Sequence, residues 1–186
     1  MVGWTSLVVP ALASAGLVFI ASSVVHMVLR WHNADYRKLP NEDVVRDAIR
    51  SASPVPGQYI LPHCTDPKQA ADPAMIRKFE EGPVGVLYVR APGRTKLGPF
   101  LISWFLYTFV VGLLVAYVAR ITLPAATSYG AVFRLTGTVA WIAYAWQGPA
   151  DSIWKGKPWR VTVREMGDGL LYGLLTAGVF GWLWPR

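Results

Sequence analysis

Cysteine is nearly absent from this sequence, since Cys64 is the only one among 186 residues. A lone cysteine excludes an internal disulfide and any metal site built from paired cysteines. The residues before Trp4 carry no charged side chain, whereas a signal peptide would place positive charge ahead of its apolar run. We find no nucleophile elbow, glycine-rich phosphate loop or metalloprotease helix motif, and this lowers the expectation of an enzyme.

The composition that remains is typical of a membrane protein. Hydrophobic residues make up 53% of the chain, nine residues are Trp, and the mean hydropathy is +0.34. The formal net charge of +7 would suggest nucleic acid in a soluble domain. In a membrane protein the same excess of Lys and Arg collects in cytosolic loops beside anionic lipid, so we do not expect nucleic-acid binding.

Long apolar runs predict four transmembrane helices, each near the length that crosses a bilayer. Because Arg30 follows the first run and no charge precedes it, we expect that run to be a retained helix rather than a signal peptide. The predicted fold is an all-α membrane protein with a small mixed α/β cytosolic insertion between helices 1 and 2. The domains are a first helix (4–30), a cytosolic segment (31–96) and three further helices (97–186), with apolar runs at 4–29, 97–121, 131–148 and 169–184.

Basic residues set the expected orientation. Residues 31–96 hold ten Lys or Arg and residues 151–168 hold four. The positive-inside rule therefore places both stretches in the cytosol and both termini in the periplasm of a bacterial inner membrane.

The cytosolic segment is expected to be partly ordered. Asn41 can cap a helix across 42–52, and Asp72-Pro73 can open a second helix across 74–81. Residues 58–62 and 84–90 are rich in β-branched and aromatic residues and predict two short strands.

Few residues in the sequence are suited to metal or cofactor chemistry. His26 lies near the cytosolic end of the first run, and a bis-histidine haem would need a second histidine that the other runs lack. His32 and Asp35 share a face if that stretch is helical, and with His63 and Cys64 they form a loosely spaced set of metal-ligand types. We interpret these groups as structural and predict no cofactor and no metal.

Two acids and an aromatic stretch are assigned to helix ends and headgroups. Asp151 and Asp168 flank the third connection, where Asp168 is expected to cap the fourth helix. Trp154, Trp159 and Arg160 lie between them and predict a stretch at the lipid headgroups.

Small residues repeat every four positions in two of the predicted helices. Such a ridge lets a second backbone approach closely, in the same bundle or in another subunit. For the fourth helix we expect the neighbour to be the first or second helix. The two ridges are Gly169, Gly173, Ala177 and Gly181, and Thr108, Gly112 and Ala116.

Three pieces of the sequence, VVHMVLRWHN, DAIRSASPVPGQYILP and DGLLYGLLTAGVFGWLWP, carry a resemblance. They resemble a group of uncharacterised bacterial four-helix inner-membrane proteins. The pieces are spread over most of the chain. The resemblance implies the membrane placement and assigns no catalytic residue.

Taken together, these features favour a small non-enzymatic membrane protein. We expect an accessory or structural subunit of a larger inner-membrane complex, or a self-associating chain, in contact with the lipid bilayer. The alternative is an oligomeric small transporter or channel that uses Arg120, Arg134 and the polar third helix. A membrane-embedded enzyme or haem carrier ranks last.

Overall fold

The computed structural model describes residues 2–186 and is mostly helical, with one two-stranded sheet. The chain divides into two compact units. A helical unit comprises the residues up to Asp35, Lys96–Ser152 and Lys157–Arg186, and a second unit comprises Tyr36–Thr95 and Ile153–Gly156. The first boundary falls after Asp35 rather than after residue 30, because residues 31–35 contact the last helix.

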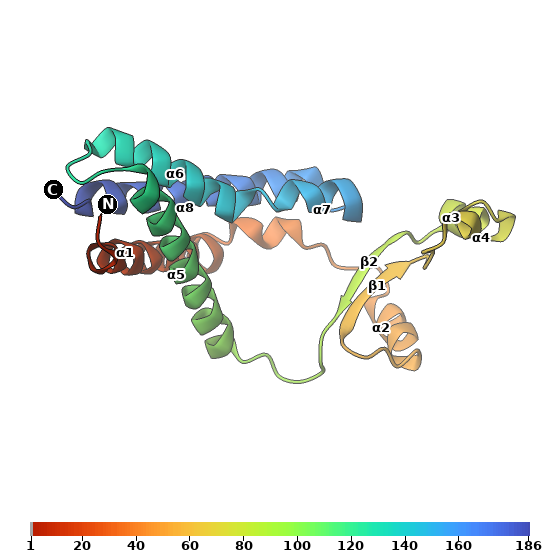
Figure 1. Cartoon of the computed structure of the whole chain (residues 1–186). Coiled ribbons are helices and arrows are strands. Elements are labelled where there is room, and N and C mark those ends of the chain that lie inside the picture. The colour runs from red at the N-terminus through yellow and green to blue at the C-terminus, as the bar shows by residue number, and fades with distance from the viewer. Residues whose placement is uncertain (1) are drawn as a thin grey trace. The chain divides into compact units, whose positions relative to one another are not determined.

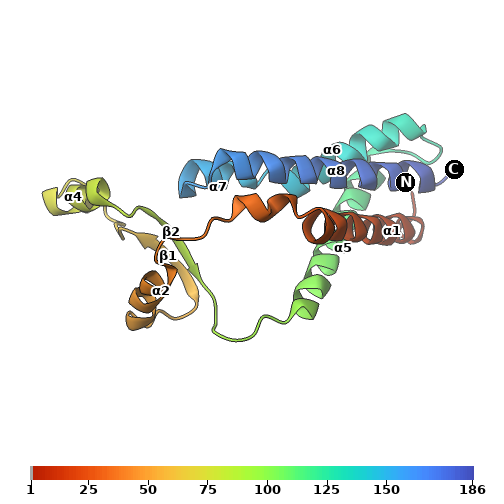
Figure 2. The ribbon, with the colours of Figure 1, turned by 180° about the vertical axis from the view of Figure 1, so that it is seen from behind.

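Four long helices form the helical unit (Figure 1). Helices α6 and α8 lie side by side, while α5 crosses them and α1 packs on both α5 and α8 (Figures 1 and 2). Their bounds are α1 Trp4–Ser23, α5 Leu97–Thr122, α6 Tyr129–Ala145 and α8 Trp159–Leu183. Two short helical segments follow α1, namely η1 Val24–Val28 and η2 Trp31–Asp35, and α7 Gly148–Lys155 lies between α6 and α8.

Two helical stretches are long and apolar enough to cross a membrane, judged by length and composition. They are Trp4–Val28 and Leu97–Thr122, with mean hydropathies of 2.2 and 2.1. Helix α6 has 17 residues and α8 begins with a charged stretch, and neither meets the same criterion. The structure therefore identifies two candidate spans among the four predicted.

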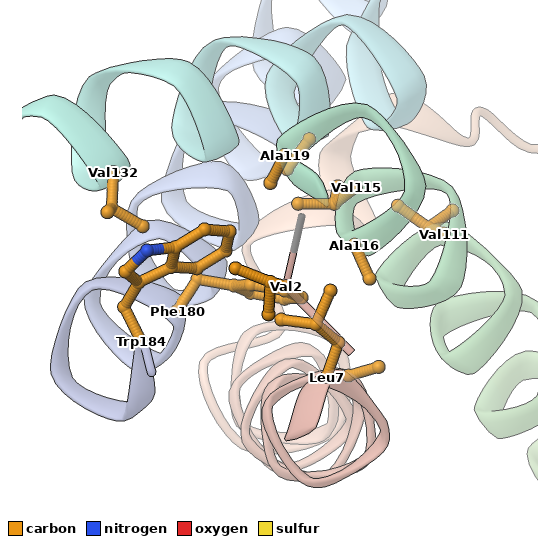
Figure 3. Packing of buried hydrophobic residues seen from close by; sticks show 11 residues of the cluster. Val2, Leu7, Val111, Val115, Ala116, Ala119, Val132, Phe180 and Trp184 are labelled. Atoms are coloured by element: carbon orange, nitrogen blue, oxygen red, sulfur yellow. The ribbon is translucent and has the colours of Figure 1, made fainter. Parts of the chain in front are cut away.

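A small-residue core joins the four helices at one end of this unit (Figure 3). Leu7, Val115 and Phe180 are almost completely buried there, each from a different helix. Val2 and Trp184 cover the core next to the chain ends. Four alanines also belong to this core, so small side chains make up much of the packing between the helices; they are Ala11, Ala116, Ala119 and Ala140.

Both termini and the connection between α5 and α6 lie at this same end (Figures 1 and 2). Arg120 Nε donates to the Val2 carbonyl over 2.9 Å, and Trp184 Nε1 donates to the Pro124 carbonyl over 3.0 Å. The Ala126 amide donates to the Pro185 carbonyl over 2.9 Å. Since the helices alternate in direction, residues 24–35 and the start of α8 lie at the opposite end.

The small-residue ridge of α8 packs on α6. A Cβ atom on Gly169 would lie 2.7 Å from Ala145 Cβ, and one on Gly181 would lie 2.7 Å from the Tyr129 ring. Gly173 lies against Gly137 and Trp141 in the same way. The neighbour is thus the third apolar helix, not the first or second as the sequence led us to expect. Spacing along one helix identifies a ridge but carries no information about which helix covers it.

The ridge of α5 packs on α1 instead. Thr108 and Ala116 are fully buried, and a Cβ on Gly112 would lie 2.9 Å from the Ala11 carbonyl oxygen. Only glycine allows this approach, because the contact is with backbone and not with a side chain that could turn away.

The second unit contains a hairpin-like sheet and three short helices. Strand β1 (Gly57–Leu61) pairs antiparallel with β2 (Gly85–Val89), with Tyr59 opposite Leu87. Helices α2 (Glu42–Ser51) and α4 (Pro73–Glu81) match the predicted ones, and Asp72 caps α4 through the Ala74 amide. The short α3 (Pro67–Ala70) was not predicted. Asn41 precedes α2, but its side chain makes no capping hydrogen bond, because the residue has a left-handed backbone with φ of 54°.

Candidate functional site

A polar cluster lies at the end of the helical unit opposite the termini. Its first member, His26, comes from the π-helical turn η1, where the Leu29 amide donates to the Val24 carbonyl over 2.9 Å. π-helical turns are rare and often occur at functional sites. Arg30 then adopts a φ of 52°, a left-handed conformation that ends the helix and reverses the chain. The reversal brings the next turn back onto His26.

His32 comes from that turn, the 3-10 helix η2. Its ring stacks on the ring of His26, with centroids 4.6 Å apart. Its Nδ1 atom lies 2.9 Å from Asp35 Oδ2, and its Nε2 atom accepts from Trp31 Nε1 over 2.9 Å. His32 and Asp35 therefore share one face of this turn, as expected if the stretch is helical, and their side chains contact each other.

Asp168 supplies the third group from the interior of α8. Asp168 Oδ2 lies 2.6 Å from His32 Nε2 and 3.8 Å from His26 Nε2. Its side chain is 9% exposed, whereas that of His26 is 48% exposed. The ligand atoms of His26, His32 and Asp168 all lie within 4.8 Å of one another. We call these three residues the His-Asp cluster.

Arg164, one turn before Asp168 on α8, holds the other carboxylate. Arg164 Nη1 donates to Asp35 Oδ1 over 2.6 Å, and the Asp35 side chain is 2% exposed. Burial alone would raise the pKa of Asp35, but the hydrogen bond with His32 and the charge of Arg164 outweigh it and hold that pKa below its usual value. Asp35 is therefore a charged, fixed partner for His32.

The arrangement has two chemical uses. As a hydrogen-bonded network, it ties the chain after the first helix to α8 through side chains 136 and 129 positions apart in sequence. As a set of converging acceptors, it is suited to a cation, because two imidazole nitrogens and one carboxylate oxygen are common metal ligands.

The remaining metal-ligand candidates are not part of this cluster. His63 and Cys64 belong to the second unit, where Cys64 Sγ donates to the Asp66 carbonyl over 3.6 Å. Asp151 lies in the first turn of α7. The prediction that Asp168 caps the fourth helix is wrong, because α8 begins at Trp159 and Asp168 lies well inside it.

The residues of the predicted headgroup stretch lie in the end of α7 and the start of α8, on either side of a short non-helical connection at 156–158. Trp154, in α7, is 83% exposed, and Trp159 begins α8. Arg160 Nη2 donates to the Ala34 carbonyl over 3.1 Å. The arginines of the transporter alternative lie elsewhere: Arg120 sits 5.4 Å above the Trp4 ring at the termini end, and Arg134 lines an open groove of about 300 Å³ between α6 and α8.

Sequence reasoning missed Asp168 and Arg164 as partners of the histidines. The sequence pattern predicted that the fourth helix begins at Gly169, whereas α8 begins at Trp159. The charged residues between these two positions were therefore assigned to a surface stretch. The available signal was the absence of proline from Trp159 to Trp184, which allows one continuous helix. Once that helix is drawn, Arg164 and Asp168 fall one turn apart on one face.

The known proteins offer no further guide to this site. No protein-family model, no curated protein and no solved structure matches this chain.

Proposed function

We propose that this chain is a small integral membrane protein of a bacterial inner membrane, with four membrane-spanning helices, and that it serves as a non-enzymatic accessory subunit of a larger membrane complex. The observation that carries the subunit role is the exposure of the second unit. None of residues 36–95, all of which the structure describes, is buried.

A folded segment of this length cannot hold its structure through its own core when it buries no side chain. Large apolar residues are instead open on it, including Val44 at 69%, Val55 at 72% and Tyr88 at 58% exposure. Apolar surface of this kind is typical of a segment that is covered by another molecule. A second subunit supplies such a cover.

Membrane placement is supported by the outward surface of the two candidate spans. In a soluble protein a helix this apolar would be buried, but only 39% of the first span and 28% of the second are buried within the chain. On α5 the residues Ile102, Leu106 and Val110 are each more than half exposed and lie one turn apart. A lipid bilayer covers such a stripe without any protein partner.

The proposal of a third and a fourth span is supported by the lengths of α6 and α8 and by their packing side by side. Helix α6 has 17 residues, about 26 Å at 1.5 Å per residue, which is close to the thickness of the hydrocarbon core. Helix α8 runs alongside α6, and its apolar part from Gly169 to Leu183 is of similar length. In this arrangement the charged start of α8 stands in the cytosol.

The proposed orientation places both termini in the periplasm and residues 31–96 in the cytosol. It is supported by the common location of the two termini and the α5–α6 connection, and by the basic residues at the opposite end. The Asp35–Arg164 ion pair lies at that cytosolic end, where it fixes the last residue before the second unit to α8.

Co-purification tests the subunit role. The full chain, expressed from its native locus and extracted into native nanodiscs, is expected to carry a second protein in a fixed ratio. Replacing Val55 and Tyr88 together by serine should release that protein, because both side chains are exposed in the second unit. The matched control replaces exposed Arg46 and Arg50 of α2 by alanine, which should leave the ratio unchanged. A particle with the mass of one chain alone would contradict the proposal.

A further inference from the structure

The His-Asp cluster brings together three electron-pair donors from separate parts of the chain. His26 comes from η1, His32 from η2 and Asp168 from α8, so the fold and not local sequence places them together. We propose that His26, His32 and Asp168 bind one divalent transition-metal ion. This site is independent of the accessory role proposed above.

The hydrogen bonds of His32 leave a space between its Nε2 atom and Asp168 Oδ2 in which a positive charge would be favourable. Its Nδ1 faces the Asp35 carboxylate, and in the neutral tautomer that donates to Asp35 the ring proton lies on this nitrogen. Its Nε2 then presents a lone pair to Asp168 Oδ2 at 2.6 Å, and the two atoms repel each other unless a cation or a second proton lies between them. A metal ion bound by Nε2, Oδ2 and His26 Nε2 supplies that charge and uses the lone pairs of all three atoms.

The three ligand atoms lie within 4.8 Å of one another, so side-chain movements can bring them to one ion. At bond lengths of 2.0–2.1 Å, neighbouring ligand atoms of a tetrahedral ion stand about 3.3 Å apart. The His32–Asp168 pair at 2.6 Å must open slightly, and the His26–Asp168 pair at 3.8 Å must close slightly. His26 is 48% exposed, and to bind the ion its Nε2 must turn from the Tyr172 hydroxyl, which now lies 3.5 Å away. Trp31, which is 52% exposed, can turn its indole N–H from His32 Nε2 to water.

The surroundings provide the second layer that protein metal sites use. A metal-bound histidine usually donates its other ring N–H to a carboxylate, which fixes the ring and strengthens the ligand. Asp35 does this for His32, and Arg164 in turn orients Asp35. The Asp35 carboxylate is thus committed to positioning, which leaves Asp168 as the anionic ligand.

The donor set defines the class of ion. Two imidazoles and one carboxylate favour Zn²⁺, Fe²⁺ and similar ions over Ca²⁺ or Mg²⁺, which prefer oxygen ligands. Three protein ligands leave at least one position open to water. An open apolar groove lined by Ser22, Met27 and Trp104 reaches His26 from the side and leaves room for a further ligand.

Zinc binding to the purified full chain tests the site. The tag-free protein, stripped of metal in detergent, is expected to bind one equivalent of Zn²⁺ in competition with a chromophoric chelator. Asp168→Asn, which keeps the side-chain shape, should weaken binding at least about 100-fold. Asp35→Asn should weaken it about 10- to 100-fold, as loss of such a second partner does elsewhere.

Two controls keep the result decisive. His63→Ala and Cys64→Ser remove the other His and Cys candidates of the cytosolic segment and should leave the affinity within about two-fold of the wild type. Each variant is checked by its melting temperature without metal, and Zn²⁺ should raise that temperature for the wild type but not for Asp168→Asn. His26→Ala, which changes a half-exposed side chain, provides a second ligand variant that keeps the part-buried Asp35–Arg164 pair.

The proposal is overturned by any of three results. The first is the absence of saturable binding at one equivalent, which would mean that a second proton on His32 supplies the charge instead. The second is an unchanged affinity in both Asp168→Asn and His26→Ala. The third is loss of binding in His63→Ala or Cys64→Ser, which would place the ion in the second unit.

Discussion

Replacing Gly173 by leucine is expected to lower the free energy of unfolding by about 3 kcal/mol, the upper part of the usual range for overpacking. A Cβ at this position would already lie 3.1 Å from the Gly137 carbonyl oxygen and 3.1 Å from the Trp141 amide nitrogen. These neighbours are backbone atoms of α6, so they cannot move aside as a side chain would. Leucine adds three further carbons, which would push α8 away from α6 and reduce their van der Waals contact.

The matched control is Leu174→Ala on the next residue of the same helix. Leu174 is 46% exposed and points off the ridge, so its truncation should cost about 1 kcal/mol or less. Unfolding of both variants in one mixed-detergent titration compares them directly. If Gly173→Leu unfolds at the wild-type midpoint, the contact between α6 and α8 described above is incorrect.

Removing the Arg164 side chain by alanine substitution should lower the melting temperature by several degrees. The change leaves the Asp35 carboxylate, which is 2% exposed, without the cation that now contacts it. The carboxylate would keep its hydrogen bond with His32 but lose its ion-pair partner, which destabilises a charge that protein largely covers. The end of the first helix should then loosen from α8, and hydrogen exchange of residues 31–35 should become faster.

Arg160→Ala is the control for this prediction. Arg160 lies one turn earlier on α8 and donates to a backbone carbonyl, that of Ala34, which water can reach and satisfy. Its loss should shift the melting temperature by less than half as much. Equal shifts in the two variants would mean that the Asp35–Arg164 pair contributes no more than an ordinary surface contact.

The sequence predicts the helices and strands best where they have clear ends. Helix α5 begins and ends within a residue of its prediction, because Lys96 precedes the apolar run and Leu123-Pro124 follows it. The strands at 57–61 and 85–89 are close to theirs, since Pro62 and Gly82-Pro83 bound them. Helix α8 was predicted too short, because hydropathy ends where charge begins although the helix continues.

The candidate site was visible in the sequence only in fragments. His32 and Asp35 are three residues apart, and their pairing follows from local helical spacing. Asp168 reaches His32 from 136 positions away, through the packing of α8 beside the end of α1. No periodicity in a single sequence carries that contact. The ridges show the same limit. The spacing identifies Gly112 and Gly173 as ridge positions, but nothing in the sequence identifies Ala11 and Gly137 as the residues that they contact.

The central claim, a membrane-spanning chain with its second unit in the cytosol, can be measured on the native sequence because Cys64 is the only cysteine. A membrane-impermeant maleimide should fail to label Cys64 in right-side-out vesicles and should label it fully in inside-out vesicles. In a Cys64→Ser background, a cysteine placed at Thr127 in the α5–α6 connection should show the reverse pattern. Labelling of Cys64 in right-side-out vesicles, or of both positions from the same side, would contradict the proposed arrangement.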